Sequence, residues 1–565
     1  MKTMKPFHLL FLCFIFLHSP VTWAVDIGAH HYTPLPTLQM DVDGRYERIQ
    51  GYAFQNFTLN VKVEANTQSG VPVDWWLVAQ VGELLFSYQF DTQLQQFYWR
   101  EGVHALAQTP LQSFPRTPLI PLSLPAGDFR LYFGLDTEAD GQLSGSLRFS
   151  TLEMNIQALQ RIFYVSPQGD DNHPGTLAQP WRSPEKAAQT AQAGDLILFR
   201  GGTYRSQLTP VNSGNAAYPI IFASHPGETA VFNGNSVNLV KGPGAPFSSL
   251  ILVNNLSHIW LMGLKVQGSQ DAGILVYNSN NILLQDNYVY DSHDAGIAVW
   301  RSQNFSVDGN EVQLANNGSG TEQENISIGE DAQDFEIRYN KIHEGGGVRG
   351  HNALSIKDGS RNGLIHHNEI TDIPNNSCLY LDAWNALVDN ISIYQNRLHD
   401  CHYHGIALAG ERGGTVSNIS IYNNLIYQNN YGLHLGNGYT SPMENIQIYN
   451  NTFYDNGPGN VYGGSIVLRN SEANQVVVRN NLMASDDVQL QKLRDASRLT
   501  VEHNLFSHED KTSSNGEMHG DNFILADPLF VNANQLDLRL QAGSPAIAQG
   551  SAATVPVDDF DGQVR

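Results

Sequence analysis

A short motif that ends in asparagine recurs through most of this chain of 565 residues. Its copies read LQDN, VDGN, IRYN, IHHN, IYQN, IYNN (twice), VRNN and VEHN, and they end at Asn287, Asn310, Asn340, Asn368, Asn396, Asn424, Asn451, Asn481 and Asn504. The intervals between them run from 23 to 30 residues. A period of this size is typical of repeat architectures, in which each copy packs only on its neighbours.

Each copy predicts three short strands. An alternating apolar run precedes the asparagine, a second run such as NLIY follows it, and a third such as GIALAG completes the copy. No copy has the length or the period of a helix. Because one coil cannot bury its own apolar face, three strands per period predict an all-β fold, the right-handed parallel β-helix. The asparagines are expected to form a buried ladder at a tight bend, which is a structural role.

The sequence on either side of the repeats predicts further parts. An amphipathic stretch from about Ser183 to Gln192 predicts a helix that covers the open end of the stack, where an unpaired sheet edge would otherwise lie. Residues 25–157 contain short alternating runs between Gly, Pro and Asp turns, which predict an accessory β-sandwich domain. The β-helix is placed at 158–525, and residues 526–565 are expected to cap its other end.

The first 24 residues have the pattern of a secretory signal peptide: Lys2 and Lys5 precede an apolar run that closes at Ala24. We expect cleavage after Ala24 and a secreted or periplasmic protein. A net charge of −23 disfavours nucleic-acid binding, and no later run is long and apolar enough to insert into a membrane. We expect a monomer.

The sequence leaves open whether Cys378 and Cys401 form a disulfide. Export permits a disulfide, but the two cysteines fall at different places around neighbouring turns.

Several segments carry a family resemblance. They are YVSPQGDDNHPGT (164–176), AGDLILFRGGTYR (193–205), the asparagine ladder, and an ending that contains LRLQAGSPAIAQG and DFDG. Together these resemble the pectate-lyase-like superfamily of secreted β-helix proteins, over about seven-tenths of the chain. The segment GHNALSIK (350–357) loosely resembles the strand that bears the catalytic lysine of family 9 polysaccharide lyases. This fold also hosts hydrolases, epimerases and adhesins, so the resemblance implies the fold more strongly than the substrate.

Charged residues gather on one face of the third strands. Strand alternation places the first and third letters of each run inside and the second and fourth outside. The fourth letters of two adjacent coils are Lys357 and Asp382, which we expect roughly 4.8 Å apart along the stack. A surface ion pair would explain these two alone. Further charged and aromatic residues lie beside them: Trp300, Arg301, Glu330, Asp331, Asp358, Trp384, Glu411 and Arg412. Tryptophan next to carboxylates is what sugar binding requires, so the cluster predicts a polysaccharide-binding cleft.

The favoured reaction is β-elimination on a polysaccharide that contains uronic acid. Lys357 is the candidate base, and the other candidate catalytic residues are Asp382, Asp358, Arg301 and Arg412. The expected substrate-binding residues are Trp300, Trp384, Glu411 and Tyr380. The resemblance also implies calcium, for which the best matches are Glu330, Asp331 and Asp358. Calcium would lower the pKa of Lys357, whereas the bare carboxylates of Asp382 and Asp358 would raise it.

Two alternatives stay open. In a glycoside hydrolase, Asp382 would act as one of two catalytic carboxylates, with Asp358 or Glu330 as the other. In a glycan-binding or adhesive solenoid, the same surface would bind sugar without turnover. The residues themselves name neither the sugar nor the linkage.

Overall fold

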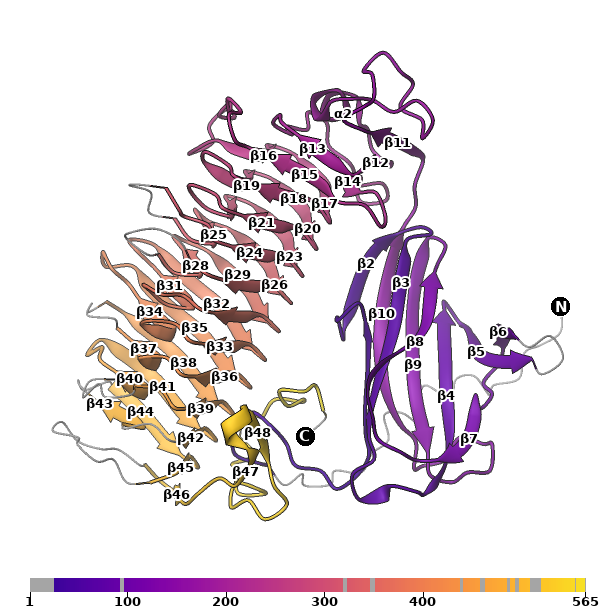
Figure 1. Cartoon of the computed structure of the whole chain (residues 1–565). Helices are drawn as coiled ribbons and strands as arrows, with labels where there is room; N and C mark the ends of the chain where they lie inside the picture. Colours follow the sequence, from indigo (N-terminus) through magenta and orange to yellow (C-terminus); the bar gives the residue numbers. More distant parts are fainter. Residues whose placement is uncertain are drawn as a thin grey trace.

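The computed structural model describes residues 25–91, 96–318, 323–345, 351–436, 441–457, 463–484, 488–492, 497–508, 520–553 and 555–563. An N-terminal domain of two sheets lies beside a long parallel β-helix (Figure 1). The all-β prediction is confirmed in both parts. The predicted signal peptide lies outside the described residues.

The N-terminal domain is a β-sandwich. One sheet contains β1 (Thr37–Val42), β3 (Asn56–Glu64) and β8 (Phe114–Ser123). The other contains β2 (Arg48–Tyr52), β10 (Arg148–Gln157), β9 (Gly127–Asp136), β4 (Pro72–Val81), β5 (Leu84–Asp91) and β6 (Gln96–Glu101), with β7 (Ala107–Pro110) also paired to β4. A short 3-10 turn, η1 (Asn66–Gln68), follows β3. Alternate residues such as Leu59, Leu77 and Phe133 are buried between the sheets, which is the period-two burial that the sequence predicts.

Successive coils of the β-helix contribute strands to three parallel sheets, of which the third begins later along the chain than the other two. The first sheet contains β11 (Arg161–Val165), β12 (Asp195–Phe199), β14 (Ile220–Ser224), β17 (Ser257–Met262), β20 (Asn280–Gln285), β23 (Gln303–Asp308), β26 (Gln333–Arg338), β29 (Arg361–His366), β32 (Leu387–Tyr394), β35 (Thr415–Tyr422), β38 (Met443–Tyr449), β41 (Ala473–Arg479) and β44 (Ser497–Glu502).

The second sheet contains β13 (Gly202–Tyr204), β15 (Ala230–Asn233), β18 (Lys265–Gln267), β21 (Tyr288–Tyr290), β24 (Glu311–Gln313), β27 (Lys341–His343), β30 (Glu369–Thr371), β33 (Arg397–His399), β36 (Leu425–Tyr427), β39 (Thr452–Tyr454), β42 (Leu482–Ala484), β45 (Leu505–Phe506) and β46 (Ile524–Leu525). The third contains β16 (Ser249–Asn254), β19 (Ala272–Tyr277), β22 (Ile297–Trp300), β25 (Ile326–Gly329), β28 (Leu354–Lys357), β31 (Leu379–Asp382), β34 (His404–Ala409), β37 (Tyr431–Leu435), β40 (Gly464–Leu468) and β43 (Leu490–Lys492).

Both ends of the β-helix are covered. At the start, α2 (Pro184–Thr190) is capped by Ser183, whose Oγ accepts a hydrogen bond from the backbone N–H of Lys186 at 3.2 Å, and it buries Ala187 and Ala188 in the core. At the far end, η2 (Ala533–Gln535) lies between the antiparallel strands β47 (Phe530–Asn532) and β48 (Asp537–Leu540). Ile27 from the start of the described chain packs with Leu540 there, so both termini help to close this end.

The asparagine ladder forms as predicted. The side-chain amide of Asn287 donates to Oδ1 of Asn310 at 2.9 Å and to the backbone carbonyl of Leu261 at 3.0 Å, and the pattern continues to Asn504. The residue before each ladder asparagine has a positive φ, between 52° and 69°: Asp286, Gly309, Tyr339, His367, Gln395, Asn423, Asn450, Asn480 and His503. These nine positions are called the bend row below. Asn, Asp and Gly tolerate this conformation best, which explains their frequency in the row.

Cys378 and Cys401 form a disulfide, with their Cα atoms 5.7 Å apart. Cys378 precedes β31 and Cys401 follows β33, so they do lie at different places around neighbouring coils. The backbone N–H of Cys401 donates to Oδ1 of Asn429, whose side chain in turn donates to Asn456 at 3.1 Å. Cys401 thus belongs to a second, shorter ladder at the bend between the second and third sheets. This bend lies close to the start of the third strand of the preceding coil, where Cys378 is located.

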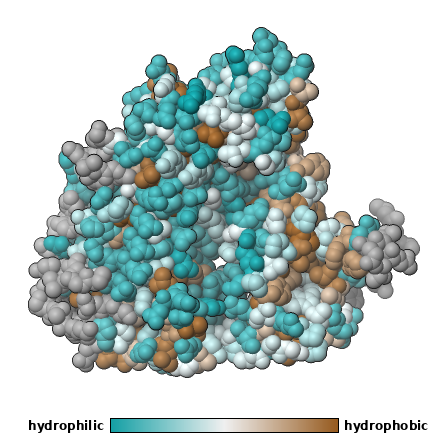
Figure 2. Space-filling model, viewed as in Figure 1, coloured by the Kyte–Doolittle hydropathy of each residue, from teal (hydrophilic) through white to brown (hydrophobic). Residues whose placement is uncertain are grey.

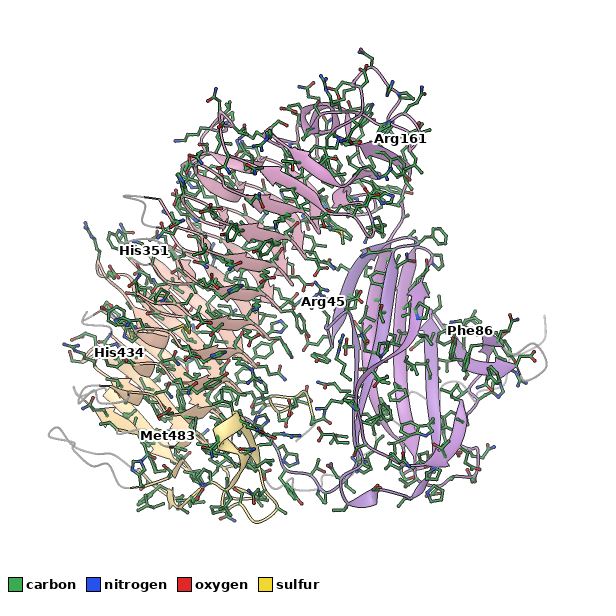
Figure 3. The ribbon with its side chains drawn as sticks, viewed as in Figure 1. Arg45, Phe86, Arg161, His351, His434 and Met483 are labelled. Atoms are coloured by element: carbon green, nitrogen blue, oxygen red, sulfur yellow. A yellow bond between two sulfur atoms is a disulfide. The ribbon has the colours of Figure 1, made fainter. Side chains whose placement is uncertain are left out.

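The bend row holds the N-terminal domain against the β-helix. Arg45 is buried there, with Nε 2.7 Å from Asp308 and Nη2 2.5 Å from Asp286 (Figure 3). Buried charges must be paired, so this contact resists separation of the domains. Further along, side chains of the row donate to backbone carbonyls near the two termini: Gln395 to Asp559, Asn423 to Asp558, Asn450 to Asp26 and Asn480 to Ser551.

Candidate active site

The predicted outward column exists on the third sheet. Lys357 pairs with Asp382 in the β28–β31 register, and Tyr277, Trp300 and Gly329 pair in sequence on the preceding coils. The first and third residues of these strands enter the core, as the alternation predicts. Lys357 and Asp382 are therefore neighbours on adjacent coils.

Lys357 is held by a residue that the sequence argument missed. Its Nζ forms an ion pair with Glu324, a fully buried carboxylate that lies just before β25 on the preceding coil. Burial lowers the pKa of Lys357, but Glu324, Asp382 and Asp358 raise it, and the net effect places the pKa above its ordinary value. The amine is therefore protonated at neutral pH in this setting.

Glu324 belongs to an acidic row at the entries of three consecutive third-sheet strands. Asp271 precedes β19, Asp294 precedes β22 and Glu324 precedes β25. Burial and the neighbouring Asp271 raise the pKa of Asp294 to about 7. Oδ1 of Asp294 and Oε2 of Glu324 are buried and have no hydrogen-bond partner among the described residues. Buried carboxylate oxygens without donors are expensive, and a cation between them would remove that cost.

Asp382 and Asp358 lie on the other side of Lys357. Burial, followed by the charge of Glu411, raises the pKa of Asp382 to about 6. Its Oδ1 accepts the backbone N–H of Trp384 at 2.9 Å. Burial also raises the pKa of Asp358, with Asp331 adding to the effect, and Oδ1 of Asp358 is buried without a donor among the described residues.

Two groups of candidate substrate-binding residues flank this centre. On the C-terminal side the guanidinium of Arg412 lies 4.5 Å from the centroid of the Trp384 ring. In the same group the Tyr380 hydroxyl donates to Glu411 at 2.6 Å. On the N-terminal side the exposed Arg301 pairs with Glu330 at 2.9 Å, while Trp300 packs edge-on against Phe247. The Trp384 ring thus contacts a cation, Arg412, whereas the Trp300 ring packs against Phe247.

The calcium ligands expected from the sequence lie just after the third-sheet strands β25 and β28. Glu330, Asp331 and Asp358 follow their strands in the left-handed region, and Glu330 is already paired with Arg301. Two groups of three residues within the described ranges bring potential ligand atoms within 4.8 Å of one another. They are Glu47, His366 and His367, and His30, Asp559 and Asp561, so the predicted group is not among them. The acidic row is not among them either. Both candidate groups contain buried oxygens without donors among the described residues, on Asp358 in one group and on Asp294 and Glu324 in the other.

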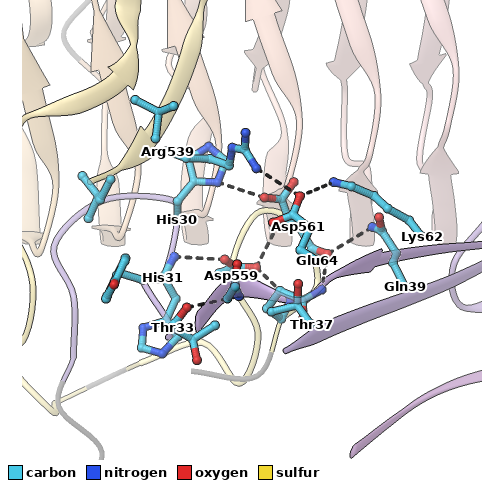
Figure 4. Close-up of a pocket in the computed structure, with 15 residues that line it drawn as sticks. His30, His31, Thr33, Thr37, Gln39, Lys62, Glu64, Arg539, Asp559 and Asp561 are labelled. Carbon is cyan, nitrogen blue, oxygen red and sulfur yellow. Dashed lines mark hydrogen bonds and ion pairs between the residues drawn. The ribbon is translucent and has the colours of Figure 1, made fainter. Parts of the chain in front are cut away.

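Two cavities lie where the N-terminal domain and the C-terminal tail meet other parts of the chain. One of about 850 Å³ lies between the sandwich and the bend row, lined by Tyr46, Glu47 and His367 among others. A smaller one, of about 210 Å³, lies at the C-terminal tail and is crossed by the pairs His30–Asp561, Lys62–Glu64 and Arg539–Glu64 (Figure 4). Figure 2 shows a largely hydrophilic surface on the β-helix in this view. Within the described ranges, no helix has the length and apolar character needed to cross a membrane.

Two family models of right-handed β-helix regions match parts of this chain. Residues 163–359 match the family model described as Pel9A-like, right handed beta helix region, and residues 384–532 match that of a right handed beta helix region. The uncharacterized protein YwoF of Bacillus subtilis is 31% identical over 120 residues, which are 21% of this chain and 25% of that protein. The pectate lyase PEL9 of Emericella nidulans is 36% identical over 85 residues, 15% of this chain and 20% of that one. The chain therefore matches a quarter or less of the length of either relative.

Two of the solved structures that match this chain do so at low identity. The crystal structure of pectate lyase Pel9A covers 72% of this chain and 98% of its own, with a TM-score of 0.47 and 15% identity. A family 28 exopolygalacturonase of Yersinia enterocolitica covers 84% and 97%, with a TM-score of 0.45 and 11% identity.

Proposed function

We propose that this chain, whose β-helix contains a Pel9A-like region, is an exported lyase that cleaves a uronic-acid-containing polysaccharide by β-elimination. The observation that carries the proposal is the setting of Lys357, an amine on the outward face of the third sheet among buried carboxylates. It lies within the Pel9A-like segment, at residues 163–359. The partial similarity to pectate lyase PEL9 supports the substrate class.

In this reaction a base takes the proton from the carbon next to the sugar carboxylate. The electrons of that C–H bond form a carbon–carbon double bond, the C–O bond to the leaving sugar breaks, and the leaving oxygen gains a proton. We assign the base to Lys357, which must be neutral to accept the proton. Its raised pKa is therefore the obstacle that the site has to overcome.

We place calcium at the acidic row, although Asp271, Asp294 and Glu324 do not bring their oxygens within 4.8 Å of one another, so the ion would have to draw them together. Asp271, Asp294 and Glu324 supply hard oxygen donors, and two of them have buried oxygens without donors among the described residues. When bound, calcium would offset the negative charge that raises the pKa of Lys357 and would attract the carboxylate of the substrate. Glu330, Asp331 and Asp358 remain the second candidate group.

The flanking residues suit a sugar chain that carries carboxylates. Arg412 covers one face of the Trp384 ring, so a sugar ring would stack on the opposite face, and the guanidinium can bind a carboxylate through two N–H groups. Arg301 offers a second cation on the opposite side of Lys357. Tyr380 and Glu411 are hydrogen-bonded to each other and border the Trp384 side.

One observation favours a glycoside hydrolase as the second candidate. With a pKa of about 6, Asp382 is suited to act as a general acid, and the nearby charge of Glu411 marks a second carboxylate. Asp358 and Glu330 are further partners for Asp382 in that reaction. A glycan-binding solenoid without turnover would use the same tryptophan and arginine residues.

The test offers the purified protein pectate, alginate, glycosaminoglycans and neutral glycans, with calcium or with chelator. Ultraviolet absorbance from an unsaturated product identifies a lyase, and new reducing ends without that absorbance identify a hydrolase. Binding without either product identifies a glycan-binding protein. Lys357→Ala should abolish the absorbance, whereas Lys341→Ala, an exposed lysine on the second sheet, should not.

A further inference from the structure

A cluster of metal-ligating side chains lies where the N-terminal domain meets the β-helix. His366 ends β29 and is fully buried, and His367 follows it in the bend row. Glu47 reaches them from the loop before β2 of the N-terminal domain. Each of the three residues has one potential ligand atom within 4.8 Å of those of the other two.

The two imidazoles share a hydrogen bond, which a metal ion would have to replace. Nδ1 of His366 lies 2.8 Å from Nδ1 of His367, while Nε2 of His366 lies 3.1 Å from the carboxylate of Glu336. If Glu336 accepts the N–H of Nε2, Nδ1 of His366 accepts the hydrogen bond that Nδ1–H of His367 donates, and a bound metal ion would take the place of that proton. Histidines that bind metals usually donate their other N–H to a carboxylate in this way, which fixes the tautomer and the ring.

Aromatic rings hold both imidazoles in place. Tyr394 stacks on His366 with ring centroids 4.6 Å apart and planes 5° apart. Tyr339 stacks on His367 at 4.8 Å. The positive charge of Arg338 nearby is balanced by Asp308 at 3.0 Å and Glu336 at 3.6 Å. The site is therefore already ordered and does not carry an unopposed positive charge.

We propose that Glu47, His366 and His367 bind a divalent transition-metal ion such as zinc, which fastens the N-terminal domain to the β-helix. Two imidazole nitrogens and one carboxylate oxygen suit zinc or cobalt, whereas calcium prefers oxygen ligands alone. The site is on the bend between the first and second sheets, and Lys357 is on the third sheet. The inference is thus independent of the proposed lyase chemistry.

The experiment titrates the chelator-treated, full-length protein with Co²⁺ by visible absorption and with Zn²⁺ by calorimetry, both in excess calcium. We expect one equivalent of either metal to bind, and the cobalt spectrum to show the ligand-field bands of a low-coordinate site with nitrogen ligands. Zinc should also raise the midpoint of thermal unfolding, because it binds only the folded state.

Glu47→Gln and His367→Ala should each weaken binding by at least about tenfold and abolish the shift in the unfolding midpoint. His343→Ala is the matched control, because His343 pairs with Glu311 at 2.9 Å on the second sheet and belongs to neither group of potential ligands among the described residues. It should bind metal as the wild type does. Absence of stoichiometric binding in the wild type, or wild-type binding by Glu47→Gln, would overturn the proposal. Because Glu47 is exposed, Glu47→Gln decides the matter even if His367→Ala does not fold.

Discussion

The ammonium group of Lys357 is paired with the buried carboxylate of Glu324, which comes from the entry of the preceding coil's third strand. Glu324 and Asp382 both raise the pKa of Lys357, so the charges around this amine decide whether it can act as a base. Three of the four predictions below test this dependence, and the other tests the scaffold.

Replacement of the proposed base should stop the reaction and leave the fold intact. Lys357→Ala should reduce turnover by about a hundredfold or more, because general-base catalysis contributes on that order. Turnover is followed by the absorbance of the unsaturated product, and folding by circular dichroism. If Lys357 and Asp382 form only a surface pair, the variant should instead retain turnover and lose under about 1 kcal/mol of stability.

Two single substitutions distinguish the candidate calcium groups. Asp294→Asn should weaken calcium binding and raise the calcium concentration needed for activity, because Asp294 has a buried oxygen that no described donor satisfies. Asp331→Asn, at an exposed position, should leave both quantities close to wild type. Calcium affinity is measured by calorimetry after chelator treatment. The opposite ranking of the variants would transfer the site to Glu330, Asp331 and Asp358, and full activity in chelator would remove calcium from the mechanism.

The raised pKa of Asp382 predicts a pH-dependent stability. Its pKa rises from 3.8 to about 6 on folding, so the folded state binds more protons than the unfolded state between these values. The contribution of Asp382 is most favourable below about pH 4 and is lost as the pH rises through 6. Asp382→Asn should therefore become more stable relative to wild type across this window, by about 3 kcal/mol at pH 7 without calcium.

Denaturant unfolding at several pH values measures this difference, and Asp334→Asn, at an exposed carboxylate, is the control. A constant difference in the free energy of unfolding between Asp382→Asn and wild type would contradict the prediction.

Asp382→Asn also distinguishes the lyase reaction from the hydrolase reaction. A hydrolase that uses Asp382 as its acid should lose its activity, because an amide cannot exchange the proton. A lyase in which Asp382 orients Lys357 should keep partial activity with a shifted pH profile.

The asparagine ladder should matter for stability alone. Asn396→Leu removes the amide that donates to Asn424 and to the carbonyls of Ile365 and Tyr394. We expect a loss of about 1–3 kcal/mol in the free energy of unfolding, since buried partners are left without hydrogen bonds. Turnover of the folded variant should match that of wild type. A drop in turnover at unchanged stability would show that the ladder affects the site.

The period of the asparagines was enough to predict the β-helix, and strand alternation was enough to place Lys357 beside Asp382. The alignment of the copies did not identify Glu324 and Asp294 as site residues. They lie before the third strands, in segments whose length differs between coils, so these segments do not align. Glu324 falls within an interval of 30 residues between ladder asparagines, against 23 in the preceding one. The sequence did not decide whether Cys378 and Cys401 form a disulfide, for a related reason. The alignment gives the place of each cysteine within its coil but not the path of the turn that brings Cys401 to Cys378.

The N-terminal segment of the chain spans the β-helix from its early coils to its last ones. Its first described residues bind the last coils, where the backbone N–H of Gly28 donates to Asn480, while Arg45 binds Asp286 and Asp308 on coils nearer the start. Contacts with the bend row recur one coil at a time, at a spacing of roughly 4.8 Å. Insertion of a whole coil between Asp308 and Asn480 would preserve the internal stacking but separate these anchors by one step. A change in the number of coils would therefore break one set of these contacts, a restriction that the stacking of the coils does not itself impose.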